Sequence, residues 1–110
     1  VCDWIEAQPQ HDGRIGLCGI SLGSITGALA TAIEPRITHS TLIIGGGNLH
    51  DIVFESVEGE AREYRKLWES RGGTRESLAE IMAPYDPITY ADRLKQRVVF
   101  MINAEQDESV

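Results

Sequence analysis

The sequence has few basic residues and no long apolar segment, and each shortage excludes a class of protein. It contains 10 Lys and Arg residues against 17 Asp and Glu residues, which gives a formal charge of −7. An acidic balance of this kind argues against nucleic acid or an anionic membrane surface as a partner. No apolar run approaches the roughly 20 residues of a membrane-spanning helix, so we expect no membrane segment.

Cysteine is too scarce for a disulfide framework. Cys2 and Cys18 are the only two, and neither belongs to a CxxC pair or to a His/Cys cluster of the kind that binds zinc. Two free thiols are typical of a reducing compartment, so we predict a cytoplasmic location. Because Cys18 lies inside an apolar run, we predict that it is buried and inert. We expect neither a metal nor a cofactor.

The remaining composition suits one globular domain. Of 110 residues, 42% are hydrophobic and 25% are charged, which is the usual range for a folded domain. The chain begins at Val1, inside a pattern of helical spacing, and it ends soon after an apolar run. We therefore expect residues 1–110 to be part of a larger protein.

Apolar runs and helical patterns alternate along the chain. The runs at 14–20, 37–45 and 97–102 lack polar alternation, which predicts strands that are covered on both faces, as in a parallel sheet. Residues 1–8 and 24–33 have helical patterns, and the small residues of the second would let it lie close to the sheet. The alternation predicts an α/β fold with three layers, a parallel sheet between helices.

Residues 48–84 differ from these alternating segments. An amphipathic stripe that includes Tyr64 and Trp68 predicts one helix. A pair of glycines ends it, and Thr74 is a plausible N-cap for the next helix, in which we expect Ile81 to be buried. We predict that 48–84 is a helical insert, which either forms a lid at the edge of the sheet or packs onto the sheet.

Gly19, Ser21 and Gly23 form a GxSxG motif at the junction of a predicted strand and a predicted helix. So tight a turn forces Ser21 into a strained conformation and lifts its Oγ clear of the sheet, and we expect both glycines to be needed because side chains there would clash. The Leu22 N–H points to the space where an oxyanion would form. We predict that Ser21 is a nucleophile; the alternative is a serine that only caps the helix.

A serine nucleophile needs a base, normally histidine, and an acid that orients the base. With this motif the chain order is Ser, acid, His. Asp107 follows the predicted strand 97–102 directly, so we predict that it is the acid, with a solvated loop carboxylate as the alternative. Asp86 is the rival acid, although its place before Pro87 is that of a helix N-cap.

The three histidines of the sequence, His11, His39 and His50, all precede Asp107. None therefore fits the expected order, and we interpret each as a surface or structural residue. His50 is the only one expected near the carboxyl edge of the sheet, and it is the alternative base.

The segments HDGRIGLCGISLGS and DPITYADRLKQRVVFMINAEQDESV, residues 11–24 and 86–110, resemble the α/β-hydrolase superfamily. They look most like its serine esterases of the acetyl-xylan-esterase and dienelactone-hydrolase-like branch. The resemblance implies a partial α/β-hydrolase fold over 1–110, in which Ser21 is the nucleophile of the elbow between Gly19 and Gly23. It also implies that Leu22 supplies an oxyanion donor and that Asp107 is the acid.

The same resemblance implies that the catalytic histidine follows the acid and that a second oxyanion donor precedes the elbow, both outside these 110 residues. We therefore expect a hydrolase that acts on small-molecule carboxylic esters through an acyl-enzyme, with the 110 residues alone inactive. Dienelactone hydrolases proper use cysteine as the nucleophile, and Ser21 departs from them there. A serine peptidase of the same fold and a non-catalytic binding scaffold are the alternatives.

Overall fold

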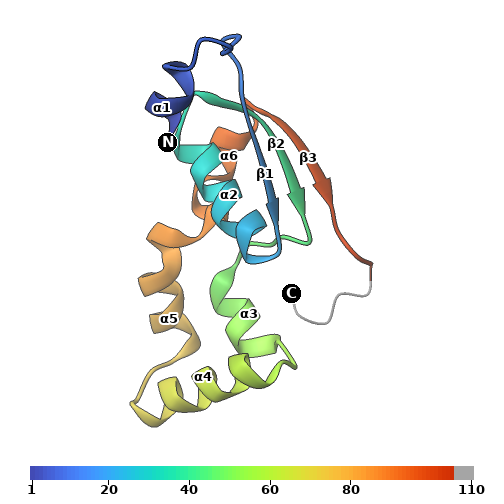
Figure 1. The fold of residues 1–110 in the computed structure, drawn as a ribbon. Coiled ribbons are helices and arrows are strands. Elements are labelled where there is room, and N and C mark those ends of the chain that lie inside the picture. Colours follow the sequence, from blue (N-terminus) through green and yellow to red (C-terminus); the bar gives the residue numbers. More distant parts are fainter. Residues whose placement is uncertain (106–110) are drawn as a thin grey trace.

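Residues 1–105 are described by a computed structural model, in which they form an α/β fold (Figure 1). Three parallel strands make one sheet in the order β1-β2-β3, and the segments that join them are helical. The predicted class and the three predicted strands are confirmed. The elements are α1 (Cys2–Glu6), β1 (Ile15–Ile20), α2 (Leu22–Ile33), β2 (Ile37–Ile43), α3 (Leu49–Glu55), α4 (Gly59–Ser70), α5 (Arg75–Met82), the 3-10 helices η1 (Ala83–Tyr85) and η2 (Pro87–Tyr90), α6 (Ala91–Leu94) and β3 (Val98–Ile102).

Helix α2 lies close against one face of the sheet because its inward residues are small. A Cβ added to Gly27 would come within 2.6 Å of a Leu17 methyl carbon, so glycine at this position lets α2 approach β1 without displacing the Leu17 side chain. One turn later the Thr31 hydroxyl shares a 2.6 Å hydrogen bond with the Ser40 hydroxyl of β2, and both residues are buried. The predicted close packing of a small-residue helix is confirmed. Helices η2 and α6 cover the same face beside α2.

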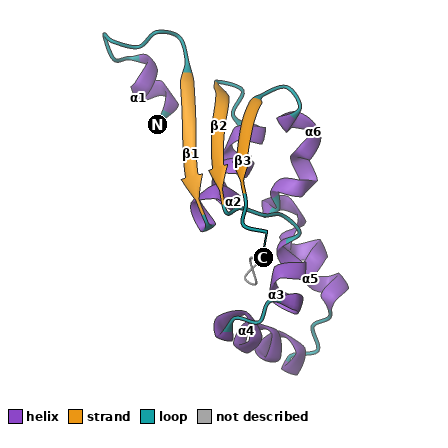
Figure 2. Cartoon of the chain, turned by 90° about the vertical axis from the view of Figure 1, so that its right-hand side faces the viewer, coloured by secondary structure: helices purple, strands orange, loops and turns teal. Residues whose placement is uncertain are grey.

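The other face of the sheet is not covered by any helix of residues 1–105 (Figure 2). Cys18, Thr41 and Phe100 lie side by side across it, and 61% of Phe100 is exposed. The prediction that Cys18 is buried is therefore wrong, since the thiol is exposed. The apolar runs identified the strands correctly, but burial of a strand also depends on what covers its second face. The second helical layer of the three-layer fold stays a prediction.

Helices α3, α4 and α5 form an arm that leaves the carboxyl edge of the sheet (Figures 1 and 2). Both views place α4 at the far end of the arm, so this part of the insert does not pack on the sheet. Arg75 joins α5 to α3 through ion pairs of 2.6 Å to Asp51 and 2.5 Å to Glu55. The predicted Thr74 cap of α5 is confirmed, whereas Ile81 is 58% exposed and its predicted burial is wrong.

Asp86 joins the base of the arm to the sheet domain. The residue is 3% exposed, and its carboxylate accepts backbone N–H groups from Ile88 at 3.1 Å, Leu49 at 2.7 Å and Asn48 at 3.1 Å. It thereby caps η2 and the start of α3 together, which satisfies donors that a helix leaves unpaired at its N-terminus. The predicted N-cap is confirmed, and the arm starts and ends at one fixed point.

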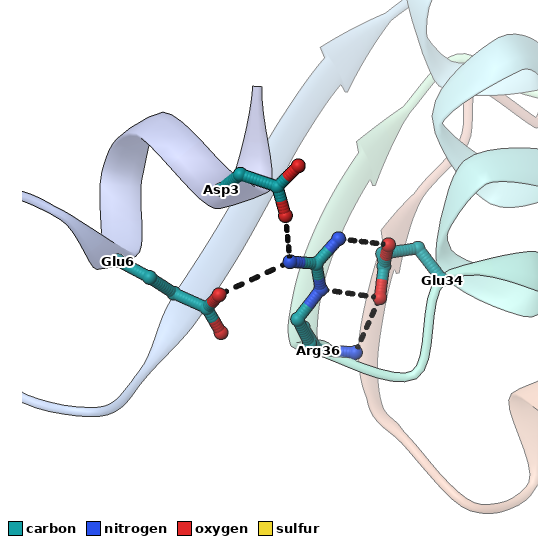
Figure 3. A network of polar contacts seen from close by, with 4 residues as sticks. All are labelled: Asp3, Glu6, Glu34 and Arg36. Atoms are coloured by element: carbon teal, nitrogen blue, oxygen red, sulfur yellow. Dashed lines mark hydrogen bonds and ion pairs between the residues drawn. The ribbon is translucent and has the colours of Figure 1, made fainter.

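An ion-pair network attaches α1 to the loop before β2 (Figure 3). The Arg36 guanidinium contacts Glu34 at 2.7 Å, Asp3 at 2.5 Å and Glu6 at 3.0 Å. Its hydrogen bonds to Glu34 lower the pKa of that carboxyl from 4.5 to about 2, because they favour the charged form. The short helix α1 has no fully buried residue, and these contacts link it to the loop before β2. Within residues 1–105, no helix has the length and apolar character needed to cross a membrane.

Candidate active site

Ser21 occupies a one-residue corner between β1, which ends at Ile20, and α2, which begins at Leu22. Its backbone angles are φ 52° and ψ −122°, in a region that residues other than glycine rarely adopt. Its N–H donates to the Ile43 carbonyl at 2.9 Å, which ties the corner to the end of β2. The side chain is exposed. The strained conformation predicted for Ser21 is confirmed, and such strain persists where the surrounding structure enforces it.

The two glycines of the motif have different surroundings. A Cβ added to Gly19 would stand 2.2 Å from the Gly23 carbonyl oxygen and 2.9 Å from the Ser24 nitrogen. The predicted need for glycine at 19 is therefore confirmed. A Cβ at Gly23 would meet no atom of residues 1–105 within 4 Å, so the predicted clash at 23 is wrong. The backbone of Gly23 crowds Gly19, whereas a side chain added at Gly23 would point away from this contact.

The first turn of α2 begins at this corner, and its backbone amides differ in what they contact. The Ser24 and Ile25 N–H groups both donate to the Ser21 carbonyl, at 2.8 and 3.2 Å. The Leu22 N–H has no backbone acceptor among residues 1–105, which leaves it available at the positive end of a helix. This arrangement suits the predicted oxyanion donor, whose catalytic role stays a prediction.

The end of β2 forms the second side of the site, and sequence reasoning missed most of it. Ile44 has φ 49°, an uncommon value for a β-branched residue, and the Gly45 N–H donates to Asn103 Oδ1 at 3.3 Å. Gly45 lies against Ser24, which is 1% exposed and whose Oγ has no hydrogen-bond partner among the described residues. A Cβ at Gly45 would stand 2.1 Å from that Oγ. Asn103 directly follows β3, and this position after a parallel strand is the sequence signal that could have identified it as a site residue.

The two candidate acids have different outcomes. Asp107 lies outside the described residues, so its role as the acid stays a prediction. Asp86 is committed to three backbone N–H groups at the base of the arm. A buried carboxylate with these partners is a structural cap, which disfavours it as the acid beside Ser21.

No hydrogen bond among residues 1–105 joins a histidine to Ser21. His50 Nε2 lies 3.1 Å from an Asp51 carboxylate oxygen on α3, and His39 Nδ1 contacts the Thr38 hydroxyl at 2.8 Å. His39 pairs with Gly16 near the amino ends of the strands, away from the corner. His11 precedes β1 at that same end. The base that Ser21 needs is thus not supplied by a contact of the described residues.

The part of the chain that is described also brings no three His, Cys, Asp or Glu side chains together in a way that could hold a metal ion. Comparison with protein-family models gives no match, and comparisons with curated proteins and with solved structures give no significant match either. The chemistry of the site therefore has to be argued from its own geometry.

Proposed function

We propose that the chain is part of a serine hydrolase that cleaves carboxylic esters through an acyl-enzyme at Ser21. The observation that carries the proposal is the corner itself, an exposed serine at φ 52° between a strand and a helix. A serine that only capped α2 would accept a hydrogen bond from the first turn, and Ser21 makes no side-chain cap bond. Maintaining strain at an exposed hydroxyl is typical of a functional residue.

In the proposed reaction, Ser21 Oγ attacks the ester carbonyl carbon while a histidine takes its proton. The carbonyl oxygen becomes an oxyanion, and the Leu22 N–H donates to it. The tetrahedral intermediate collapses, the bond to the alcohol oxygen breaks and the histidine protonates the leaving alcohol. Water then attacks the acyl-enzyme by the same steps and releases the acid. Asp107 orients the histidine, which we expect outside these 110 residues.

The finer features of the fold belong to the same proposal. We infer a partial α/β-hydrolase fold, whose second helical layer would cover the open face that carries Cys18 and Phe100. The arm of α3, α4 and α5 leaves the edge that bears Ser21, which supports its role as a lid over the substrate. Two free thiols support a reducing, cytoplasmic compartment.

Labelling with a fluorophosphonate probe tests the proposal in the full-length protein. We expect covalent labelling that disappears in Ser21→Ala and persists in Ser70→Ala, a matched control because Ser70 is an exposed serine on α4. The Ser21→Ala change removes one oxygen from an exposed turn, so the fold should be retained, which circular dichroism would check. A folded full-length protein that is not labelled would contradict the proposal and favour a non-catalytic scaffold.

A further inference from the structure

We propose that an apolar cavity beneath the glycine run at the end of β2 holds the acyl chain of the ester, an inference that rests on the proposed function. The cavity has a volume of about 250 Å³ and lies between α2, the covered face of the sheet, and η2 with α6. Its walls are formed by Ala28 of α2, Leu42 and Met101 of the sheet, Ile88 of η2, and Ala91 and Leu94 of α6.

The end of this cavity at the carboxyl edge adjoins the Ser21 corner. Gly45 and Asn103 line it there. The Ser21 N–H is bonded to the carbonyl of Ile43, two residues before Gly45, and Gly45 packs on Ser24 in the first turn of α2. Because β1 and β2 are paired and neighbouring strands lie about 4.8 Å apart, Gly45 lies roughly one strand spacing from the Ser21 corner, and we infer that the acyl chain of an ester at Ser21 enters here. Ligands of parallel α/β sheets bind at this edge.

The direction of the cavity suits a chain rather than a compact group. Ala28 stands seven residues after Ser21 on α2, which is roughly 10 Å along the helix axis. The lining therefore extends along α2 from the carboxyl edge over a length greater than that of an acetyl group, and the half-exposed Ile88 and Met101 leave the cavity open to solvent. Glycines at 45, 46 and 47 leave the entrance without side chains that would close it.

The lining selects hydrocarbon. Among residues 1–105, its lining contains no Asp, Glu, Lys or Arg side chain, and the one polar side chain there, Asn103, accepts the Gly45 N–H at the entrance. A charged group placed inside would have no partner, whereas an alkyl chain gains by leaving water. The occupant that fits is an unbranched acyl chain of medium length, with its carbonyl at the polar entrance.

Chain-length profiles of the full-length protein and two variants test this inference. We expect kcat/KM for p-nitrophenyl hexanoate to exceed that for the acetate by roughly fourfold per buried methylene. Ala91→Phe places a ring in the cavity from an exposed position and should reduce the hexanoate-to-acetate ratio by roughly tenfold or more. Leu94→Ala enlarges the cavity and should move the preference toward longer esters. Ala7→Phe is the matched control, an exposed alanine beside α1, and should leave the ratio unchanged.

Fluorophosphonate labelling separates the failure of this inference from the failure of the proposed function. If Ala91→Phe and Leu94→Ala are labelled at the rate of the unchanged protein but keep its chain-length profile, the cavity is not the acyl site, and an apolar side chain from elsewhere in the protein is its occupant. If the unchanged protein is not labelled at all, the proposed function fails and this inference fails with it.

Discussion

Alanine substitutions at the two glycines of the GxSxG motif should have opposite effects on stability. At Gly19 the new Cβ would lie 2.2 Å from the Gly23 carbonyl oxygen, 2.6 Å from the Gly23 carbonyl carbon and 2.9 Å from the Ser24 nitrogen. All three atoms are backbone, so the first turn of α2 must move as a whole. Overpacking of a tight site costs about 1–3 kcal/mol, and we expect Gly19→Ala to lie at the upper end, about 3 kcal/mol.

At Gly23 the same change meets no atom of the described residues within 4 Å and replaces glycine in the first turn of a helix. Alanine there reduces the entropy of the unfolded chain, so Gly23→Ala should stabilise the protein by about 0.5–1 kcal/mol. The assay is urea unfolding followed by circular dichroism. With a slope of about 1–3 kcal/mol per M, the midpoint should fall by roughly 1–3 M for Gly19→Ala and rise slightly for Gly23→Ala. Equal losses at both glycines would refute the reasoning.

Three further predictions concern contacts that stabilise the fold. Gly45→Ala should destabilise the fold by about 2 kcal/mol, because the new Cβ meets Ser24. Ser24→Gly in the same protein should relieve much of that loss, and a double-mutant cycle in urea would measure the coupling between the two changes. Asp86→Ala should cost about 3 kcal/mol, since it leaves three backbone N–H groups without their acceptor; thermal unfolding would measure this. Arg36 lowers the pKa of Glu34 to about 2, so the ion pair stabilises the fold above pH 4.5 and this stabilisation is lost as the pH falls toward 2. Urea midpoints of the unchanged protein and of Glu34→Gln, measured between pH 7 and 2, should differ at pH 7 and converge at low pH.

Each of these predictions has a defined contrary result. Additive losses in the Gly45 and Ser24 double variant would mean that the two residues do not meet. Asp86→Asn keeps one acceptor oxygen and should lose less stability than Asp86→Ala, so equal losses would argue against the capping role. A difference between the unchanged protein and Glu34→Gln that is constant over the pH range would show that the ion pair with Arg36 does not form in solution.

The local structure could be predicted because its causes lie within a few residues. Unbroken apolar runs mark all three strands, Pro87 after Asp86 marks a cap, and two glycines around Ser21 mark a corner too sharp for a relaxed backbone. Each signal depends on sterics or hydrogen bonding between near neighbours. The order of the elements and the position of the candidate nucleophile follow from them.

Burial and the surroundings of the site could not be predicted in the same way, because they depend on segments far apart in the sequence. Cys18 is in a strand as expected, but its exposure depends on whether anything covers that face of the sheet. A side chain at Gly19 would clash with the backbone of Gly23, but a side chain at Gly23 would not clash with Gly19. This difference depends on the path of the backbone through the turn, which the sequence pattern does not show. The contact of Gly45 with Ser24 joins the end of β2 to the start of α2, and no local sequence pattern predicts it.

Mass spectrometry of the full-length protein after fluorophosphonate treatment tests the central claim most directly. We expect a single adduct on the peptide that contains Ser21, because within residues 1–105 that hydroxyl alone is both exposed and held at a strained corner. An adduct on another serine, with Ser21 unmodified in the folded protein, would contradict it.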